Sequence, residues 1–173
     1  DSLDKSFFLQ HATAPALNAS LRKLQKLRQD VEAHGFGKAP NDFIGLARQE
    51  VAWATQSTTL ALEKSLAALE YNQWREDPAC LSATSRKRLA TRLEQIADRQ
   101  SEQLTTLAEL WLARAAISDF KKTRKRIRGS IASLRRGATR LRENAPPKPP
   151  KPTPIGMLDV FNEVRRAYGM APR

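Results

Sequence analysis

Apolar residues recur every three or four positions through most of this chain, and this spacing restricts it to helices. The first such stripe is Leu17, Leu21, Leu24, Leu27 and Val31. Residues with this spacing share one face of an α-helix, whereas a half-buried strand would alternate apolar and polar residues. Glycine occurs only seven times in 173 residues, and runs of β-branched residues are few. The sequence therefore argues against a β-rich fold.

Three later segments show the same apolar spacing. The second helix is expected to begin after Pro40 and to stop at Asp77-Pro78, because the residue before a proline disfavours helix. A third helix is expected to follow a turn at residues 81–85, where serine and threonine side chains can cap it. No helix-breaking residue lies near Ser118, so the third and fourth segments are either two helices or one continuous helix.

The second helix raises two further questions. Residues 55–59 are Thr-Gln-Ser-Thr-Thr, a run of low helix propensity at which the helix can break. Trp74, near the helix end, has the best chance of partial exposure among the three tryptophans. We expect Trp53, Trp74 and Trp111 to pack in the core or at its edge, with stacking on bases as the less favoured alternative.

The fourth segment has an apolar stripe that suits packing against another long helix. From Ile127 onward its spacing repeats every seven residues. Gly129 and Gly137 interrupt it, and each costs about 1 kcal/mol relative to alanine in a helix interior. These glycines either allow another backbone to approach closely or weaken the helix. The residues expected to face inward are Phe120, Ile127, Ile131, Leu134 and Leu141.

These patterns predict an all-α fold, an antiparallel bundle of three or four long helices with a Pro-rich C-terminal arm and a short terminal helix. The bundle is expected over residues 1–144, with a strongly basic last helix. Residues 145–154 contain six prolines, which exclude helix and favour an extended polyproline II linker. Residues 155–173 form a short amphipathic docking helix in this prediction.

Most of the net positive charge of the chain lies in one segment. The chain carries +12, and residues 119–145 contain ten lysines and arginines against only Asp119 and Glu143, a local surplus of +8. Like charges four residues apart on a helix repel one another. A polyanion laid along the helix would remove that repulsion and release condensed counterions. The ten cations are Lys121, Lys122, Arg124, Lys125, Arg126, Arg128, Arg135, Arg136, Arg140 and Arg142.

This surplus predicts binding of nucleic acid through its phosphates. Arginine predominates among the ten cations, and its guanidinium binds phosphate with two parallel hydrogen bonds. The sequence contains no zinc finger, RNA-stacking motif or helix-turn-helix signature, so no readout of base sequence is expected. We therefore predict a non-enzymatic nucleic-acid-binding subunit whose partner is DNA, RNA or another polyanion. The simpler alternative is a solvated basic face, or one that pairs with the more acidic second helix.

The C-terminal segment predicts a second contact, with a protein. Its apolar residues can dock into a hydrophobic groove on a partner, including another copy of the chain, or fold back on the bundle. This supports an alternative function as a helical scaffold or adaptor, such as an assembly or secretion module, that binds an acidic protein. A third possibility is an accessory helical domain of a larger enzyme. The docking residues are Met157, Leu158, Phe161, Val164 and Tyr168.

No group of residues in the sequence assembles an active site or a metal site. One cysteine, Cys80, and two histidines, His11 and His34, are too few for a Cys-rich zinc site or a His-rich metal site. The carboxylates of the second helix are typical of a solvated face. We expect neither enzymatic activity nor a cofactor. The single thiol fits a reducing compartment, and no run of 18 apolar residues exists, so we expect a cytoplasmic protein without a membrane span.

Overall fold

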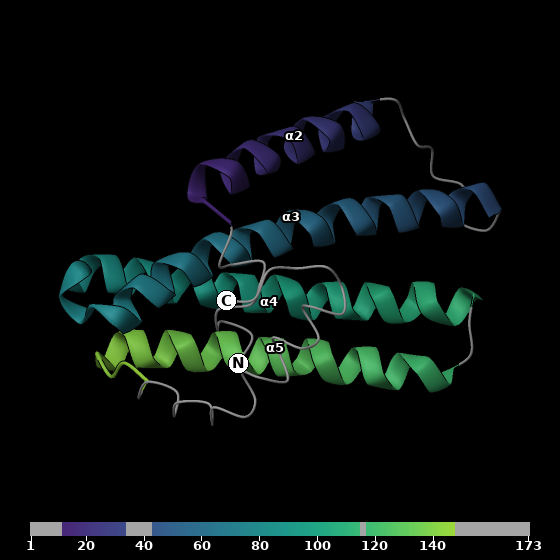
Figure 1. Ribbon diagram of the computed structural model, residues 1–173. Coiled ribbons are helices and arrows are strands. Elements are labelled where there is room, and N and C mark those ends of the chain that lie inside the picture. The colour runs from purple at the N-terminus through teal and green to yellow at the C-terminus, as the bar shows by residue number, and fades with distance from the viewer. Residues whose placement is uncertain (1–11, 34–42, 115–116, 148–173) are drawn as a thin grey trace, which may run out of the picture.

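The computed structural model describes residues 12–33, 43–114 and 117–147 (Figure 1). These residues form four α-helices and a short 3-10 helix, and no strand occurs among them. The all-α prediction is therefore confirmed for this part of the chain. The docking segment 155–173 and most of the Pro-rich arm lie outside the described residues. The helices are α2 (Ala14–Ala33), α3 (Phe43–Glu76), α4 (Ala83–Arg114) and α5 (Ile117–Glu143).

The helix ends follow from local sequence signals. Helix α3 ends at Glu76, and the Asp77 side chain then accepts a hydrogen bond from the backbone N–H of Ala79 at 3.1 Å, which caps the 3-10 helix Pro78–Cys80. The predicted stop at Asp77-Pro78 is thus confirmed. Helix α4 begins beside Ser82, whose Oγ accepts from the backbone N–H of Ser85 at 3.1 Å. This is the serine cap expected in the 81–85 turn.

Helix α3 runs without a break through the Thr-Gln-Ser-Thr-Thr segment. The hydroxyl groups of Thr55, Thr58 and Thr59 each donate to the carbonyl oxygen four residues earlier, at 2.8–2.9 Å. These bonds satisfy the hydroxyls within the helix, so they do not compete for other backbone groups. A continuous helix over the third and fourth segments is wrong, because α4 ends at Arg114 and α5 begins at Ile117 as a separate packed helix.

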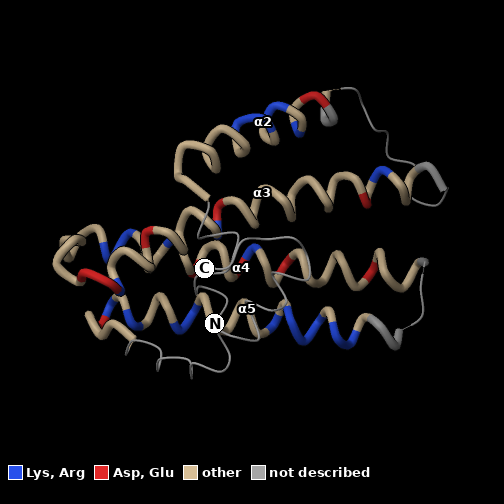
Figure 2. The backbone as a smooth tube through the Cα atoms, in the orientation of Figure 1, with Lys and Arg blue, Asp and Glu red and all other residues tan. Residues whose placement is uncertain are grey.

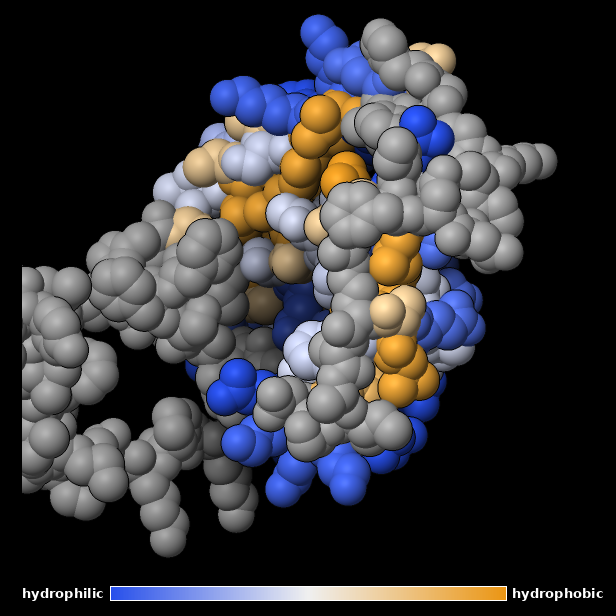
Figure 3. Space-filling model, turned by 90° about the vertical axis from the view of Figure 1, so that its right-hand side faces the viewer, coloured by the Kyte–Doolittle hydropathy of each residue, from blue (hydrophilic) through white to orange (hydrophobic). Residues whose placement is uncertain are grey.

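The helices pack in chain order. Figure 1 shows α3, α4 and α5 lying side by side, with α2 against α3 on the side away from α5. The most extensive contact is between α4 and α5. Within the described residues, α5 therefore packs mainly against α4, and much of its surface is exposed. At one end of the molecule, apolar residues reach the surface between strongly hydrophilic ones (Figure 3).

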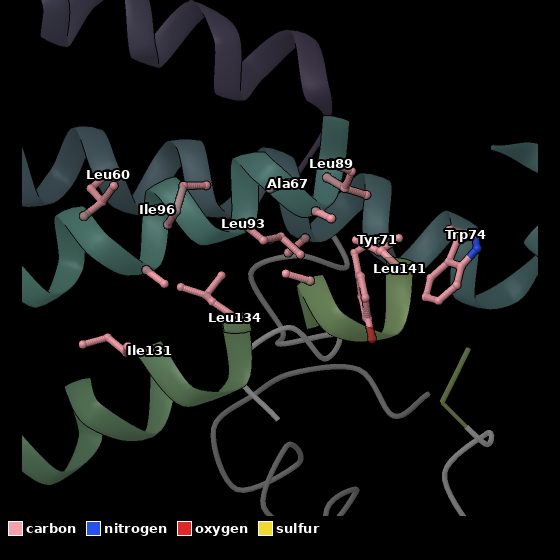
Figure 4. Packing of buried hydrophobic residues seen from close by; sticks show 14 residues of the cluster. Leu60, Ala67, Tyr71, Trp74, Leu89, Leu93, Ile96, Ile131, Leu134 and Leu141 are labelled. Atoms are coloured by element: carbon pink, nitrogen blue, oxygen red, sulfur yellow. The ribbon is translucent and has the colours of Figure 1, made fainter. Parts of the chain in front are cut away.

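The core lies between α3, α4 and α5 (Figure 4). The six largest fully buried side chains come from these three helices, whereas α2 adds the buried Leu17. Burial of such side chains contributes roughly 1.5–3 kcal/mol each relative to exposure. The six are Trp74, Leu89, Leu93, Ile96, Leu134 and Leu141.

All three tryptophans pack, as expected, but Trp74 is the most buried of them and not the most exposed. Trp74 is completely buried, because the core cluster reaches the end of α3, where the ring lies 5.5 Å from that of Tyr71. Trp53 is half-buried and donates its Nε1–H to the carbonyl oxygen of Gln103 at 3.1 Å.

A polar bridge connects the three core helices and was not foreseen from the sequence. The Nζ of Lys64 on α3 donates to Ser130 Oγ on α5 at 2.7 Å, and that hydroxyl donates to Gln100 Oε1 on α4 at 3.1 Å. Burial lowers the pKa of Lys64 below its ordinary value. Since a buried polar group without a partner is costly, this chain of bonds favours one register of the three helices.

The core assignment is tested by two matched leucine truncations on α4. Leu93→Ala is expected to lower the free energy of unfolding by about 2–5 kcal/mol, because it opens a cavity in a fully buried cluster. Leu112→Ala, at a side chain that is 58% exposed, is expected to change it by less than about 0.5 kcal/mol. Urea denaturation measures both values, and equal losses would contradict the assignment.

Gly129 offers a stabilising substitution. A Cβ added at this residue would have nothing within 4 Å, so close approach of another helix does not explain the glycine. Gly129→Ala is therefore expected to raise the free energy of unfolding by about 1 kcal/mol through helix propensity alone. The same denaturation measurement checks this, and an unchanged or lower stability would show that the glycine has a structural role.

Candidate functional site

All ten predicted cations lie on α5. Nine of them are exposed and Arg140 is half-buried. Figure 2 shows lysine and arginine positions recurring along the whole helix. The site is therefore a charged helix face and not a pocket lined by a few converging groups.

The apolar stripe of α5 is what turns these cations outward. Phe120, Ile131, Leu134 and Leu141 are buried against the rest of the bundle, as predicted, whereas Ile127 is half-buried. Because successive residues of a helix are rotated by about 100°, fixing this stripe inward leaves the cations on the flanks and the outer face.

Two of the ten cations have carboxylate partners on α4. The guanidinium of Arg142 binds both carboxylate oxygens of Glu94, and Arg135 Nη2 lies 3.1 Å from Asp98 Oδ1. All four side chains are substantially exposed. Exposed ion pairs contribute little to stability, so these two mainly align α4 with α5.

The Arg142 pair also changes the acidity of Glu94. Its hydrogen bonds to the guanidinium hold the pKa of Glu94 below the ordinary value of 4.5, although partial burial acts in the opposite direction. Glu94 is therefore charged throughout the neutral range and keeps Arg142 on the α4 side of α5.

The other eight cations form no ion pair among the residues that the structure describes. The alternative in which α5 pairs with the acidic second helix is not what the described part of the chain shows. There, Glu63 and Glu70 of α3 pair with Arg99 and Arg92 of α4. The positive surplus of α5 thus remains largely unbalanced within the described ranges.

The cations divide into two sets by their position around α5. The seam arginines are Arg124, Arg128, Arg135 and Arg142, on the flank beside α4. The outer cations are Lys121, Lys122, Lys125, Arg126, Arg136 and Arg140, which lie further round the helix. This division was not drawn from the sequence, because it depends on which side of α5 faces α4.

An open groove of about 730 Å³ follows the boundary between α4 and α5. Its floor is apolar, with Leu104 and Ala108 from α4 beside Phe120 and Ile131 from α5. Phe120 also packs against Trp111, with ring centroids 5.9 Å apart. The rim of the groove includes Arg124, Arg128 and Arg135 of the seam arginines, with Arg136 of the outer cations.

No protein-family model, curated protein or solved structure matches this chain. Over residues 12–33, 43–114 and 117–147, no cluster of three or more His, Cys, Asp or Glu side chains is placed to hold a metal ion. No helix in those ranges is long and apolar enough to cross a membrane. Cys80 is exposed.

The ion pair between Glu94 and Arg142 predicts a pH-dependent difference in stability. Because the pKa of Glu94 is lowered in the folded state, its stabilising effect is complete above about pH 4.5 and is lost as the pH falls through the lower folded value. Glu94→Gln is therefore expected to be less stable than the wild type at pH 7 and equally stable in strong acid. Denaturation curves at several pH values test this.

Glu109→Gln provides the control for this comparison. Glu109 is exposed on the same helix and forms no ion pair among the described residues. If Glu94→Gln lowers the free energy of unfolding by the same amount at pH 7 and at pH 3, the ion pair does not cause the loss. The same conclusion follows if Glu109→Gln gives the same loss.

Proposed function

We propose that α5 binds the phosphate backbone of nucleic acid, and that the protein is a non-enzymatic binding subunit without readout of base sequence. One observation carries this proposal: eight of the ten α5 cations lack a carboxylate partner among the described residues. Had the arginines been buried against acidic side chains of the bundle, the charge would already be satisfied. Their exposure leaves them available to an external anion.

The length of the charged face suits a polymer better than a small anion. From Lys121 to Arg142 the helix extends about 32 Å, at 1.5 Å per residue. A polyanion that follows this length can contact several cations at once and release a counterion for each phosphate that they neutralise. A single small anion would meet only one or two of them.

We also propose that the helices run antiparallel and that the C-terminal region contacts a protein partner. An antiparallel course of the helices is supported by the order of the ion pairs, since Arg142 meets Glu94 whereas the earlier Arg135 meets the later Asp98. We propose that the arm 145–154 carries the segment 155–173 to a protein partner, and that the protein acts in the cytoplasm.

An adaptor that binds an acidic protein through α5 is the second candidate function, favoured by the apolar floor of the α4–α5 groove.

Charge reversal on the outer face tests the proposed function. The triple variant Lys121→Glu, Lys125→Glu, Arg136→Glu is expected to weaken binding of a nucleic acid and to reduce the slope of log affinity against log salt by about three, one for each lost phosphate contact. Fluorescence anisotropy with a labelled oligonucleotide over a range of salt concentrations measures both effects. The two ion-paired seam arginines are left intact, so the α4–α5 contact is preserved.

A variant of equal charge change on α2 is the control. Arg22→Glu, Lys23→Glu, Lys26→Glu also changes the net charge by −6, at three exposed residues far from α5 in sequence. This control is expected to keep the wild-type salt slope. If both triple variants weaken binding equally, the effect comes from net charge, and α5 is not the interface. If the wild type binds no nucleic acid even at low salt, the proposed function is wrong.

A further inference from the structure

The contact between α4 and α5 contains an incomplete series of ion pairs. Along this boundary, Arg142 and Arg135 each meet a carboxylate of α4, Glu94 and Asp98. The same flank of α5 continues through Arg128 and Arg124, which border the groove. The α4 side of this groove is lined by two hydroxyl side chains and by no carboxylate.

These two hydroxyls, Ser101 and Thr105, line the same groove as Arg124 and Arg128. All four side chains are exposed, and the two arginines form no ion pair among the described residues. Each pair is separated by four residues, or about 6 Å along its helix axis. Guanidinium groups and hydroxyl donors that line one groove make a place suited to an oxyanion.

The apolar floor beside these donors favours a ligand that also has an apolar surface. Leu104 and Ala108 are half-buried, whereas Phe120 and Ile131 are each only 7% exposed. An inorganic anion would leave this floor in contact with water. A nucleotide has both features, since a flat base with apolar faces adjoins its phosphate, and bases also stack on guanidinium planes.

We propose that the α4–α5 groove binds single-stranded nucleic acid, with phosphates at Arg124 and Arg128 and bases over Leu104 and Ala108. This inference rests on the proposed function and specifies its ligand. In a duplex the base faces are already stacked and cannot contact the floor.

Charge distribution favours a strand over an acidic protein helix as the occupant. A helix seated in the groove would pair with the groove arginines but would leave most of the outer cations unpartnered. A flexible strand can leave the groove over Arg136, which borders both sets of cations, and continue along the outer face. The strand therefore satisfies both sets of cations with one ligand.

Three labelled probes of equal length test the inference on the full chain by fluorescence anisotropy. They are a thymidine oligomer, an abasic oligomer with the same phosphates but no bases, and a duplex. The thymidine oligomer is expected to bind at least about tenfold more tightly than the other two, because only it offers unstacked bases to the floor.

A groove variant locates the effect. Ser101→Glu, Thr105→Glu places two carboxylates on the α4 side of the groove, where they would repel a phosphate and compete for the groove arginines, and is expected to abolish the preference for the thymidine oligomer. The matched control Thr91→Glu, Gln95→Glu places two glutamates with the same spacing at exposed positions of α4 outside the groove. The control is expected to retain the preference.

The outcomes separate this inference from the proposed function. Equal, salt-dependent affinity for all three probes would overturn the single-strand groove and leave phosphate binding by α5 intact. Absence of binding to every probe at low salt would overturn both. A glutamate-rich amphipathic peptide that binds the wild type more tightly than the thymidine oligomer, and is lost in the groove variant, would assign the groove to a protein partner. If the groove variant does not fold, the comparison of the thymidine and abasic oligomers on the wild type still tests whether bases contribute to binding, and equal affinity for the two would overturn the inference.

Discussion

The packing of one apolar stripe against α4 determines the direction of every charged side chain on α5. Phe120, Ile131, Leu134 and Leu141 are buried along that contact, and a helix has no freedom to turn its other residues once one stripe is fixed. The cations consequently share the open part of the helix, although they repel one another there. Apolar burial at this contact outweighs that repulsion, since each buried side chain contributes roughly 1.5–3 kcal/mol and a like-charge pair costs only a few tenths.

Among the described residues, the ion pairs that relieve this repulsion lie only in the C-terminal half of α5. Glu94 and Asp98 meet Arg142 and Arg135 near the C-terminal end of α5. Ser101 and Thr105, which follow Asp98 along α4 and line the groove, provide no charge. The density of positive charge is highest at this end, where six of the eight residues from Lys121 to Arg128 are basic. The unbalanced charge and the apolar-floored groove thus coincide, which is the arrangement a ligand with both anionic and apolar parts requires.

Features that depend on local sequence could be predicted, and features that depend on helix neighbours could not. The stop at Asp77-Pro78, the serine cap before α4 and most of the inward stripe of α5 follow from residues within a few positions of one another. Packing of Trp74 in the core or at its edge was predicted, but its complete burial was not, because its environment comes from α4 and α5 as well as α3. Lys64 gave no sequence signal for its bond to Ser130, 66 residues away. In the same way, the ten cations could be identified from the sequence, but their division into seam arginines and outer cations required the position of α4.

The ion pairs and the polar bridge together explain how a helix with so few acidic residues keeps a defined register. Hydrophobic contact alone tolerates small rotations and slides of one helix on another, because it has no direction. The Lys64–Ser130–Gln100 bonds fix α5 on its inner side, and the Glu94 and Asp98 pairs fix it on the flank beside α4. A rotation of α5 would break bonds on both sides at once. The arginines that lack a carboxylate are therefore held in place by polar contacts elsewhere on the same helix, so the groove can remain open without loss of alignment.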